Sequence, residues 1–157
     1  TSSVSRIGRR AAMKRCFLNM LALSAGFTFI YVLVQLVGVS VFVDMDILIS
    51  KHFYQNMIFY YIAVFIIFSF GGVCYLLFYV ITRLKIVSLL MAVAVNLYMV
   101  YYLKIDNLYF GLTVIDTMSL GGSVQAVIWF LKRVRDIAIT TGIYMLADVV
   151  YEKRDIV

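Results

Sequence analysis

The chain of 157 residues contains 64% hydrophobic and 14% charged residues, against roughly 45–50% and 25% in a soluble globular domain. A globular fold of this size cannot bury so much apolar surface, so the composition excludes an ordinary soluble domain. The net charge of +6 does not indicate nucleic-acid binding, because the basic residues lie between apolar runs and do not line a groove. We expect no nucleic-acid partner and interpret the basic residues as signals of membrane topology.

Residues 1–15 form a basic arm, TSSVSRIGRRAAMKR, and no acid precedes Asp44. The arm is rich in Ser and Arg, as mitochondrial presequences are. Two interpretations stay open: a segment beside a presequence cleavage site, or an ordinary cytoplasmic basic arm. The first favours the mitochondrial inner membrane, and the alternative is another cellular or bacterial inner membrane.

Four apolar runs follow within residues 16–131, and we predict that each forms a transmembrane helix. The predicted spans are 16–43, 53–82, 86–103 and 108–131. Small residues within them allow close helix packing. The candidates are Ala22, Gly26, Gly71, Gly72, Gly121 and Gly122.

The C-terminal segment 132–157 differs from the spans. Its apolar part, 137–151, is short for a span, and its apolar positions do not gather on one helical face. We predict a helix that lies on the membrane surface or docks on a neighbouring protein. A fifth crossing is the alternative.

The basic residues predict the topology. Four spans place the N-terminal arm, the turn at 83–85 and the C-terminal segment on one side of the membrane, and a 12-to-2 split of basic residues fits the positive-inside rule. The side with 12 carries Arg6, Arg9, Arg10, Lys14, Arg15, Arg83, Lys85, Lys132, Arg133, Arg135, Lys153 and Arg154, and the other carries Lys51 and Lys104.

Aromatic residues gather near the predicted charge-poor side. The tyrosines concerned are Tyr60, Tyr61, Tyr98, Tyr101, Tyr102 and Tyr109, and Trp129 with Phe130 is expected at the opposite interface. We favour interfacial anchoring and helix packing as the explanation. The alternative is an aromatic surface for a lipid, a quinone or a partner subunit.

One acid, Asp116, lies inside the fourth predicted span. Counted at ~1.5 Å per residue from the charge-poor ends, it is about 12 Å deep, level with Asn96 at about 10 Å and Gln35 at about 12 Å. A polar stripe completes this layer: Thr113, Ser119 and Ser123. An intramembrane acid is costly unless it is neutral, paired or hydrated. We favour a structural role, holding helices or subunits together, over a proton or cation site.

The sequence therefore predicts an all-α integral membrane protein. We expect a bundle of four transmembrane helices, with both termini on the positive side and a C-terminal interfacial or partner-docked helix. No catalytic constellation or metal-ligand spacing is present, so we expect no enzyme activity, no metal and no cofactor beyond bound structural lipids.

The favoured function is a non-catalytic accessory subunit of a larger membrane complex, in the energy-transducing machinery of the mitochondrial inner membrane. Its expected partners are membrane lipids and other membrane subunits. One alternative is a small oligomeric proton- or ion-coupled channel or transporter that uses Asp116. A third hypothesis is a lipid- or quinone-binding membrane subunit that uses the tyrosines.

Overall fold

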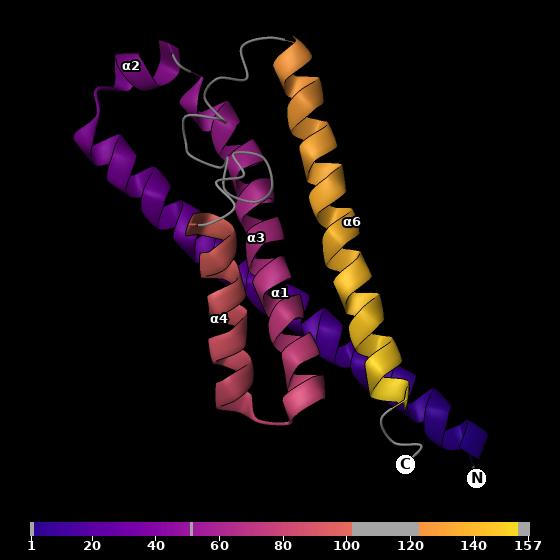
Figure 1. Cartoon of the computed structure of the whole chain (residues 1–157). Coiled ribbons are helices and arrows are strands. Elements are labelled where there is room, and N and C mark those ends of the chain that lie inside the picture. The colour runs from indigo at the N-terminus through magenta and orange to yellow at the C-terminus, as the bar shows by residue number, and fades with distance from the viewer. Residues whose placement is uncertain (1, 51, 102–122, 154–157) are drawn as a thin grey trace.

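The computed structural model describes residues 2–50, 52–101 and 123–153, with side chains described except at 2–7, 9, 10, 99–101 and 123–125. In chain order the described elements are α1 (Ser2–Phe42), α2 (Met45–Ser50), α3 (Phe53–Thr82), α4 (Lys85–Tyr101) and α6 (Ser123–Lys153) (Figure 1). No strand occurs in these ranges. The predicted all-α class is therefore confirmed for the described residues.

Helix α3 is the centre of the bundle. It lies between α4 and α6, and α1 crosses it obliquely (Figure 1). The face that its buried side chains occupy shifts along the helix, from Phe53, Met57 and Tyr60 to Val73, Leu76 and Val80. This shift is possible because the run carries no charged residue, so different faces can be buried against different neighbours.

Helices α1 and α3 run antiparallel. Near the start of α1, Met13 packs with Leu76 and Val80 of α3, whereas Val32 packs with Phe53 and other residues at the start of α3. The N-terminal arm is part of α1 and continuous with its apolar portion. The arm is thus not a separate segment, because Met13 within it contributes to the packed core.

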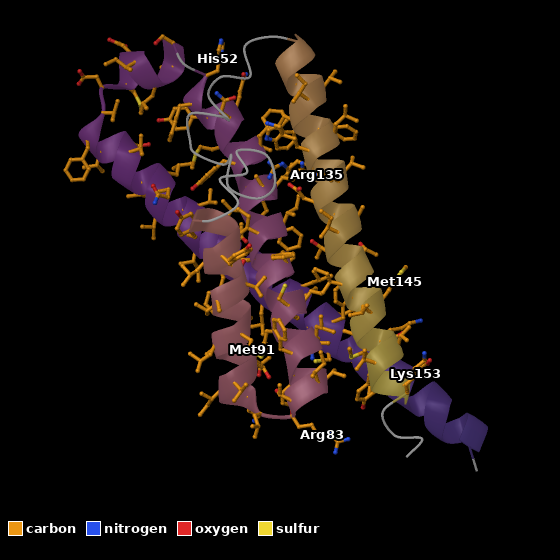
Figure 2. The ribbon with its side chains drawn as sticks, in the orientation of Figure 1. His52, Arg83, Met91, Arg135, Met145 and Lys153 are labelled. Atoms are coloured by element: carbon orange, nitrogen blue, oxygen red, sulfur yellow. The ribbon has the colours of Figure 1, made fainter. Side chains whose placement is uncertain are left out.

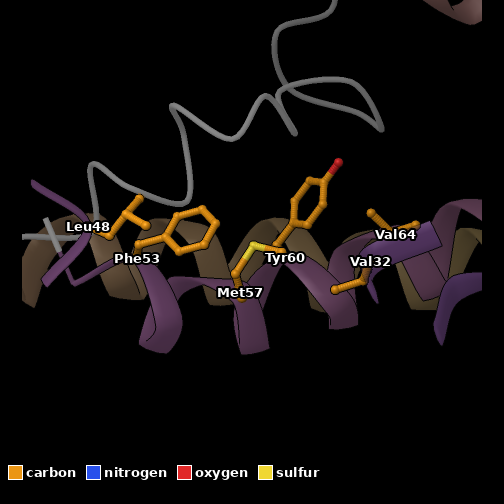
Figure 3. Close-up of a cluster of buried hydrophobic side chains, with 6 residues drawn as sticks. All are labelled: Val32, Leu48, Phe53, Met57, Tyr60 and Val64. Atoms are coloured by element: carbon orange, nitrogen blue, oxygen red, sulfur yellow. The ribbon is translucent and has the colours of Figure 1, made fainter. Parts of the chain in front are cut away.

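The short helix α2 closes the connection between α1 and α3. Leu48 of α2 is buried against Phe53, in a cluster completed by side chains of α3 and α1 (Figure 3). That cluster consists of Val32, Leu48, Phe53, Met57, Tyr60 and Val64. Burial of Leu48 fixes the position of the connection, since apolar contact is the main stabilising term for so short a helix.

Helices α3 and α4 form a tight hairpin. Arg83 adopts the left-handed conformation (φ 59°), and its backbone N–H donates to the Tyr79 carbonyl at 2.8 Å. The hydroxyls of Thr82 and Ser88 lie 3.0 Å apart across the turn. The Arg83 bond satisfies a carbonyl that the end of a helix leaves open, and the hydroxyl contact links the two helices across a turn that contains neither Gly nor Pro.

Helix α6 differs from the prediction. We predicted a span ending at 131 and a separate C-terminal helix, but one helix runs from Ser123 to Lys153. The basic residues at 132–135 do not interrupt it, because Lys and Arg are good helix formers and the chain contains no proline.

Helix α6 packs on α3 of the same chain and runs parallel to it. Trp129 contacts Phe59 near the start of α3, and Ala147 packs with Leu76 and Val80 near its end. The apolar residues of the C-terminal segment are thus covered in part by the chain itself.

Two of the described helices are long and apolar enough to cross a membrane. They are Ala11–Phe42, with a mean hydropathy of 2.0 over its most apolar part, and Phe53–Thr82, with 2.4. Lys85–Tyr98 is a shorter apolar helix. Length and composition therefore support two of the four predicted spans.

The close approach of α1 to α3 depends on Gly72. A Cβ atom at Gly72 would lie 2.6 Å from Met20 Sδ of α1. We expect Gly72→Leu to lower the free energy of unfolding by about 1–3 kcal/mol, the usual cost of overpacking. Thermal unfolding of the purified protein in detergent measures the change.

Gly38→Leu on α1 is the matched control, because a Cβ there would have nothing within 4 Å. Adding Met20→Ala to Gly72→Leu should recover much of the lost stability. Equal destabilisation by the two glycine substitutions would contradict the assigned contact.

Candidate functional site

Much of the predicted polar layer lies outside the described residues. Asp116, Thr113 and Ser119 belong to this group, as do the glycines and tyrosines Gly121, Gly122, Tyr102 and Tyr109. Ser123 opens α6 and Tyr101 ends α4, and only their backbone is described. The predicted common depth of Asn96 and Asp116 stays a prediction.

The structure separates Asn96 from Gln35. Asn96 of α4 lies against Gly71, where an added Cβ would be 3.5 Å from its Nδ2, and this amide donates to the Ala92 carbonyl at 2.7 Å. Gln35 precedes Leu36, which packs on the cluster that includes Met57. Positions 57 and 71 are 14 residues apart on α3, or about 21 Å along the helix. The two side chains therefore lie at different levels of the bundle, contrary to the predicted common depth.

The four described small residues fall into two groups. Gly71 faces Asn96 of α4 and Gly72 faces Met20 of α1, so both lie at helix contacts. Ala22 is exposed on α1, and a Cβ at Gly26 would have nothing within 4 Å. The Ala22–Gly26 pair thus does not pack within the described part of the chain.

The described tyrosines do not form one aromatic surface. Tyr60 is buried and its hydroxyl donates to the Tyr31 hydroxyl of α1 at 3.4 Å, and the Tyr61 hydroxyl lies 3.5 Å from the Ala25 carbonyl. Tyr98 of α4 is exposed. Tyr60 and Tyr61 therefore pack against α1, as expected from the helix-packing interpretation.

A cluster of charged residues lies on the inward face of α6, and the sequence analysis did not single it out. The inward face follows spacings of three and four residues, and its members are Trp129, Arg133, Asp136, Thr140, Ile143 and Ala147. Asp136 is fully buried and Arg133 is 4% exposed. We call Trp129, Arg133, Arg135 and Asp136 the α6 charge cluster.

Asp136 is the centre of this cluster. Arg135 donates to Asp136 Oδ1 from Nε at 3.2 Å and from Nη2 at 2.9 Å. Arg133 Nη1 lies 3.5 Å from the other carboxylate oxygen, Oδ2. The guanidinium carbon of Arg133 also lies 5.6 Å from the centroid of the Trp129 ring, a cation–π arrangement.

The cluster lies in the half of α6 nearer its N-terminal end, where Figure 2 labels Arg135. Trp129 stacks edge-on against Phe59 of α3, with ring centroids 5.2 Å apart. Further along, Ile139 and Ile143 pack on a cluster that includes Ile66. The charges are thus enclosed between two apolar contacts with α3, away from the end of the bundle that carries the α3–α4 turn.

This position corrects two predictions. Trp129 was expected at the interface opposite Phe59, and Arg133 was counted with the basic residues at the α3–α4 turn. The structure brings Trp129 and Phe59 into contact, because α6 begins at Ser123 and continues past Lys132. Lys132, Arg133 and Arg135 therefore do not lie at the end of the bundle that carries the α3–α4 turn. The predicted 12-to-2 split of basic residues between the two sides loses these three.

The cluster was missed because the tripeptide Arg133-Val134-Arg135 was interpreted as the end of a span. Arg133 and Asp136 have the i, i+3 spacing that places two side chains on one helix face. Apolar residues at helical spacing do not identify this face as buried, because two of its buried positions are charged. The sequence signal that could have revealed the cluster was Asp136, the acid directly after these basic residues.

The ion pairs of the cluster join residues of α6 itself, and Trp129 provides its contact with α3. Moving a carboxylate and a guanidinium out of water costs several kcal/mol for each ion, and only good pairing offsets this cost. The double donation of Arg135 to Oδ1, the contact of Arg133 with Oδ2 and the Trp129 ring offset part of this cost. In the described ranges, no three His, Cys, Asp or Glu residues lie together in a way that could hold a metal ion.

Comparisons of the chain with protein-family models, with curated proteins and with solved structures gave no match. The described fold defines the class: an all-helical protein with two helices able to cross a membrane.

We expect Asp136→Ala to lower the free energy of unfolding by about 3–5 kcal/mol, because the buried Arg133 then loses the acid that pairs with it. Thermal unfolding in detergent measures this loss. Asp148→Asn, on an intermediate position of the same helix, is the control and should change stability little.

The double variant Arg133→Met/Asp136→Leu should be close to the wild type, since replacing a buried ion pair with apolar residues is often neutral or stabilising. Simple addition of the effects of Arg133→Met and Asp136→Leu would contradict the assigned pairing.

Proposed function

We propose that the chain is an integral membrane protein in which the long helices cross the bilayer. Large apolar side chains are exposed along the outer sides of α1, α4 and α6, with Leu23, Phe27 and Ile86 all more than 60% exposed. A soluble protein rarely leaves contiguous apolar surface of this kind in water. Together with the two membrane-length helices, this surface supports a lipid environment.

We propose that the N-terminal arm, the α3–α4 turn and the end of α6 share one side of the membrane. The start of α1, this turn and the C-terminal end lie toward the same end of the bundle (Figure 1). Lys14, Arg83, Lys85 and Lys153 belong to these segments. Basic residues concentrate on the cytoplasmic side of membrane proteins, which supports this orientation without the residues of the α6 charge cluster.

Cysteine labelling tests the topology. In a background lacking both native cysteines, Arg83→Cys and Lys153→Cys should react with an impermeant maleimide from the same side of a sealed vesicle. Asp46→Cys on α2 should react from the opposite side, because α2 lies at the other end of α3. Labelling of Asp46→Cys and Arg83→Cys from one side would contradict the proposal.

We propose that the protein is a non-catalytic accessory subunit of a larger membrane complex. The observation that carries this proposal is the open outer face of α1, where Ala22 and Gly26 are exposed in the described structure. Small residues four apart allow the backbone of a second helix to approach closely within a membrane.

For the location we propose the mitochondrial inner membrane, on the basis of the Ser- and Arg-rich start of α1. Fluorescence microscopy of the tagged protein with an inner-membrane marker tests this. Residence in another membrane would leave the subunit role open but exclude the energy-transducing assembly.

Gly26→Leu should abolish co-purification of the partner subunit in mild detergent, because the new side chain occupies the space for the second helix. The unfolding temperature of the Gly26→Leu variant should stay near that of the wild type, since a Cβ at Gly26 meets nothing within 4 Å. Mass spectrometry of the purified complex measures the partner.

Ala94→Leu is the matched control, a small-to-large change at an exposed position of α4, and it should leave the complex intact. Two results would contradict the proposal: retention of the partner by Gly26→Leu, or a wild-type chain that purifies only as a homo-oligomer.

A further inference from the structure

A groove of about 500 Å³ lies between α1 and α3, and neither Ala22 nor Gly26 lines it. Its volume is within the range of about 300–1,000 Å³ found for ligand sites. The part from α1 includes Cys16, Asn19 and Phe27, the part from α3 includes Phe68 and Tyr79, and Lys85 of α4 completes it.

The groove is polar at one end and apolar along the rest. Lys85 and Tyr79 lie at the α3–α4 turn, whereas Phe27 and Phe68 lie toward the middle of their helices. Phe68 and Tyr79 are 11 residues apart, or about 16 Å along α3. That length is about half of the ~30 Å hydrocarbon core, the depth of one leaflet.

The cation at the mouth has basic neighbours in the sequence. Arg83 precedes Lys85 in the turn, and Lys14 and Arg15 directly precede Cys16 on α1. Basic pockets between transmembrane helices, at the positive side of a membrane, suit the phosphate of an anionic lipid. The apolar length of the groove suits an acyl chain that descends from the same headgroup.

We propose that this groove binds one anionic phospholipid, with its phosphate on Lys85 and an acyl chain along Met20, Leu23 and Phe27 toward Phe68. The proposal uses the membrane placement proposed above but not the accessory-subunit role. Its occupant is a lipid because the positive charge lies at the headgroup level and the apolar lining covers one leaflet.

Protection of Cys16 from a maleimide provides the test. Cys16 is exposed and lines the groove, and the buried Cys74 is replaced by Ala. The full chain is purified in detergent, and dioleoylphosphatidylglycerol or dioleoylphosphatidylcholine is added, two lipids with the same acyl chains. The anionic lipid should slow the reaction at a lower mole fraction than the zwitterionic one.

Lys85→Gln should raise the mole fraction of phosphatidylglycerol that half-protects Cys16 from the maleimide about fivefold, which is the effect of one basic residue near a lipid surface. Lys153→Gln, at an exposed lysine outside the groove, should match the wild type. Native mass spectrometry should find one retained phosphatidylglycerol in the wild type and none in Asn19→Trp, which fills the groove.

Three outcomes overturn the proposal: equal protection by the two lipids, equal weakening by the two lysine substitutions, or a co-purified polypeptide that protects Cys16 before lipid is added. The sidedness of Arg83→Cys and Lys153→Cys labelling is independent of these results. A failure of the lipid site is therefore distinguishable from a failure of the membrane placement.

Discussion

The described structure depends on the close approach of three helices to α3. Gly71 and Gly72 are neighbours in sequence, yet they serve different contacts, because successive residues of a helix point about 100° apart. Gly71 admits Asn96 of α4 and Gly72 admits Met20 of α1. In a membrane, helix association relies on van der Waals packing rather than on the exclusion of water. A Cβ at Gly71 would make an ordinary contact with Asn96 at 3.5 Å, whereas a Cβ at Gly72 would clash with Met20, so Gly72 is the glycine that the packing on the central helix requires.

The α6 charge cluster adds a different constraint on the same helix. Apolar contacts alone would hold α6 on α3 at several rotations, since their energy depends on area and not on direction. The ion pairs of Asp136 with Arg133 and Arg135 lie within α6 and turn with it, so the aromatic contact, which has a preferred geometry, is what relates the cluster to α3. Phe59 and Trp129 cover one end of the cluster. The edge-to-face contact of Trp129 with Phe59 thus gives the α6 charge cluster its position against α3.

The sequence predicted the helices better than their contacts. The apolar run 53–82 coincides with α3, because a long uncharged run has a single helical interpretation. The boundary at Lys132 was wrong, since charge marks the end of a span only where the helix reaches the headgroups, and here Arg133 and Asp136 are buried inside the packed face. The predicted common depth of Asn96 and Gln35 was also wrong. Counting residues from the ends of the predicted spans ignores the oblique crossing of α1 on α3 (Figure 1).

The same crossing explains why α1 offers two different surfaces. A helix that crosses its neighbour at an angle leaves wedge-shaped grooves beside the line of contact unless side chains fill them. The groove near Lys85 is one wedge, and a second lies between Leu33 of α1 and Ile58 of α3. The second wedge is lined by apolar residues and Tyr54 and Tyr61, with no cation. The two wedges share their apolar chemistry and differ in charge, so charge is the property that gives the first one selectivity among lipids.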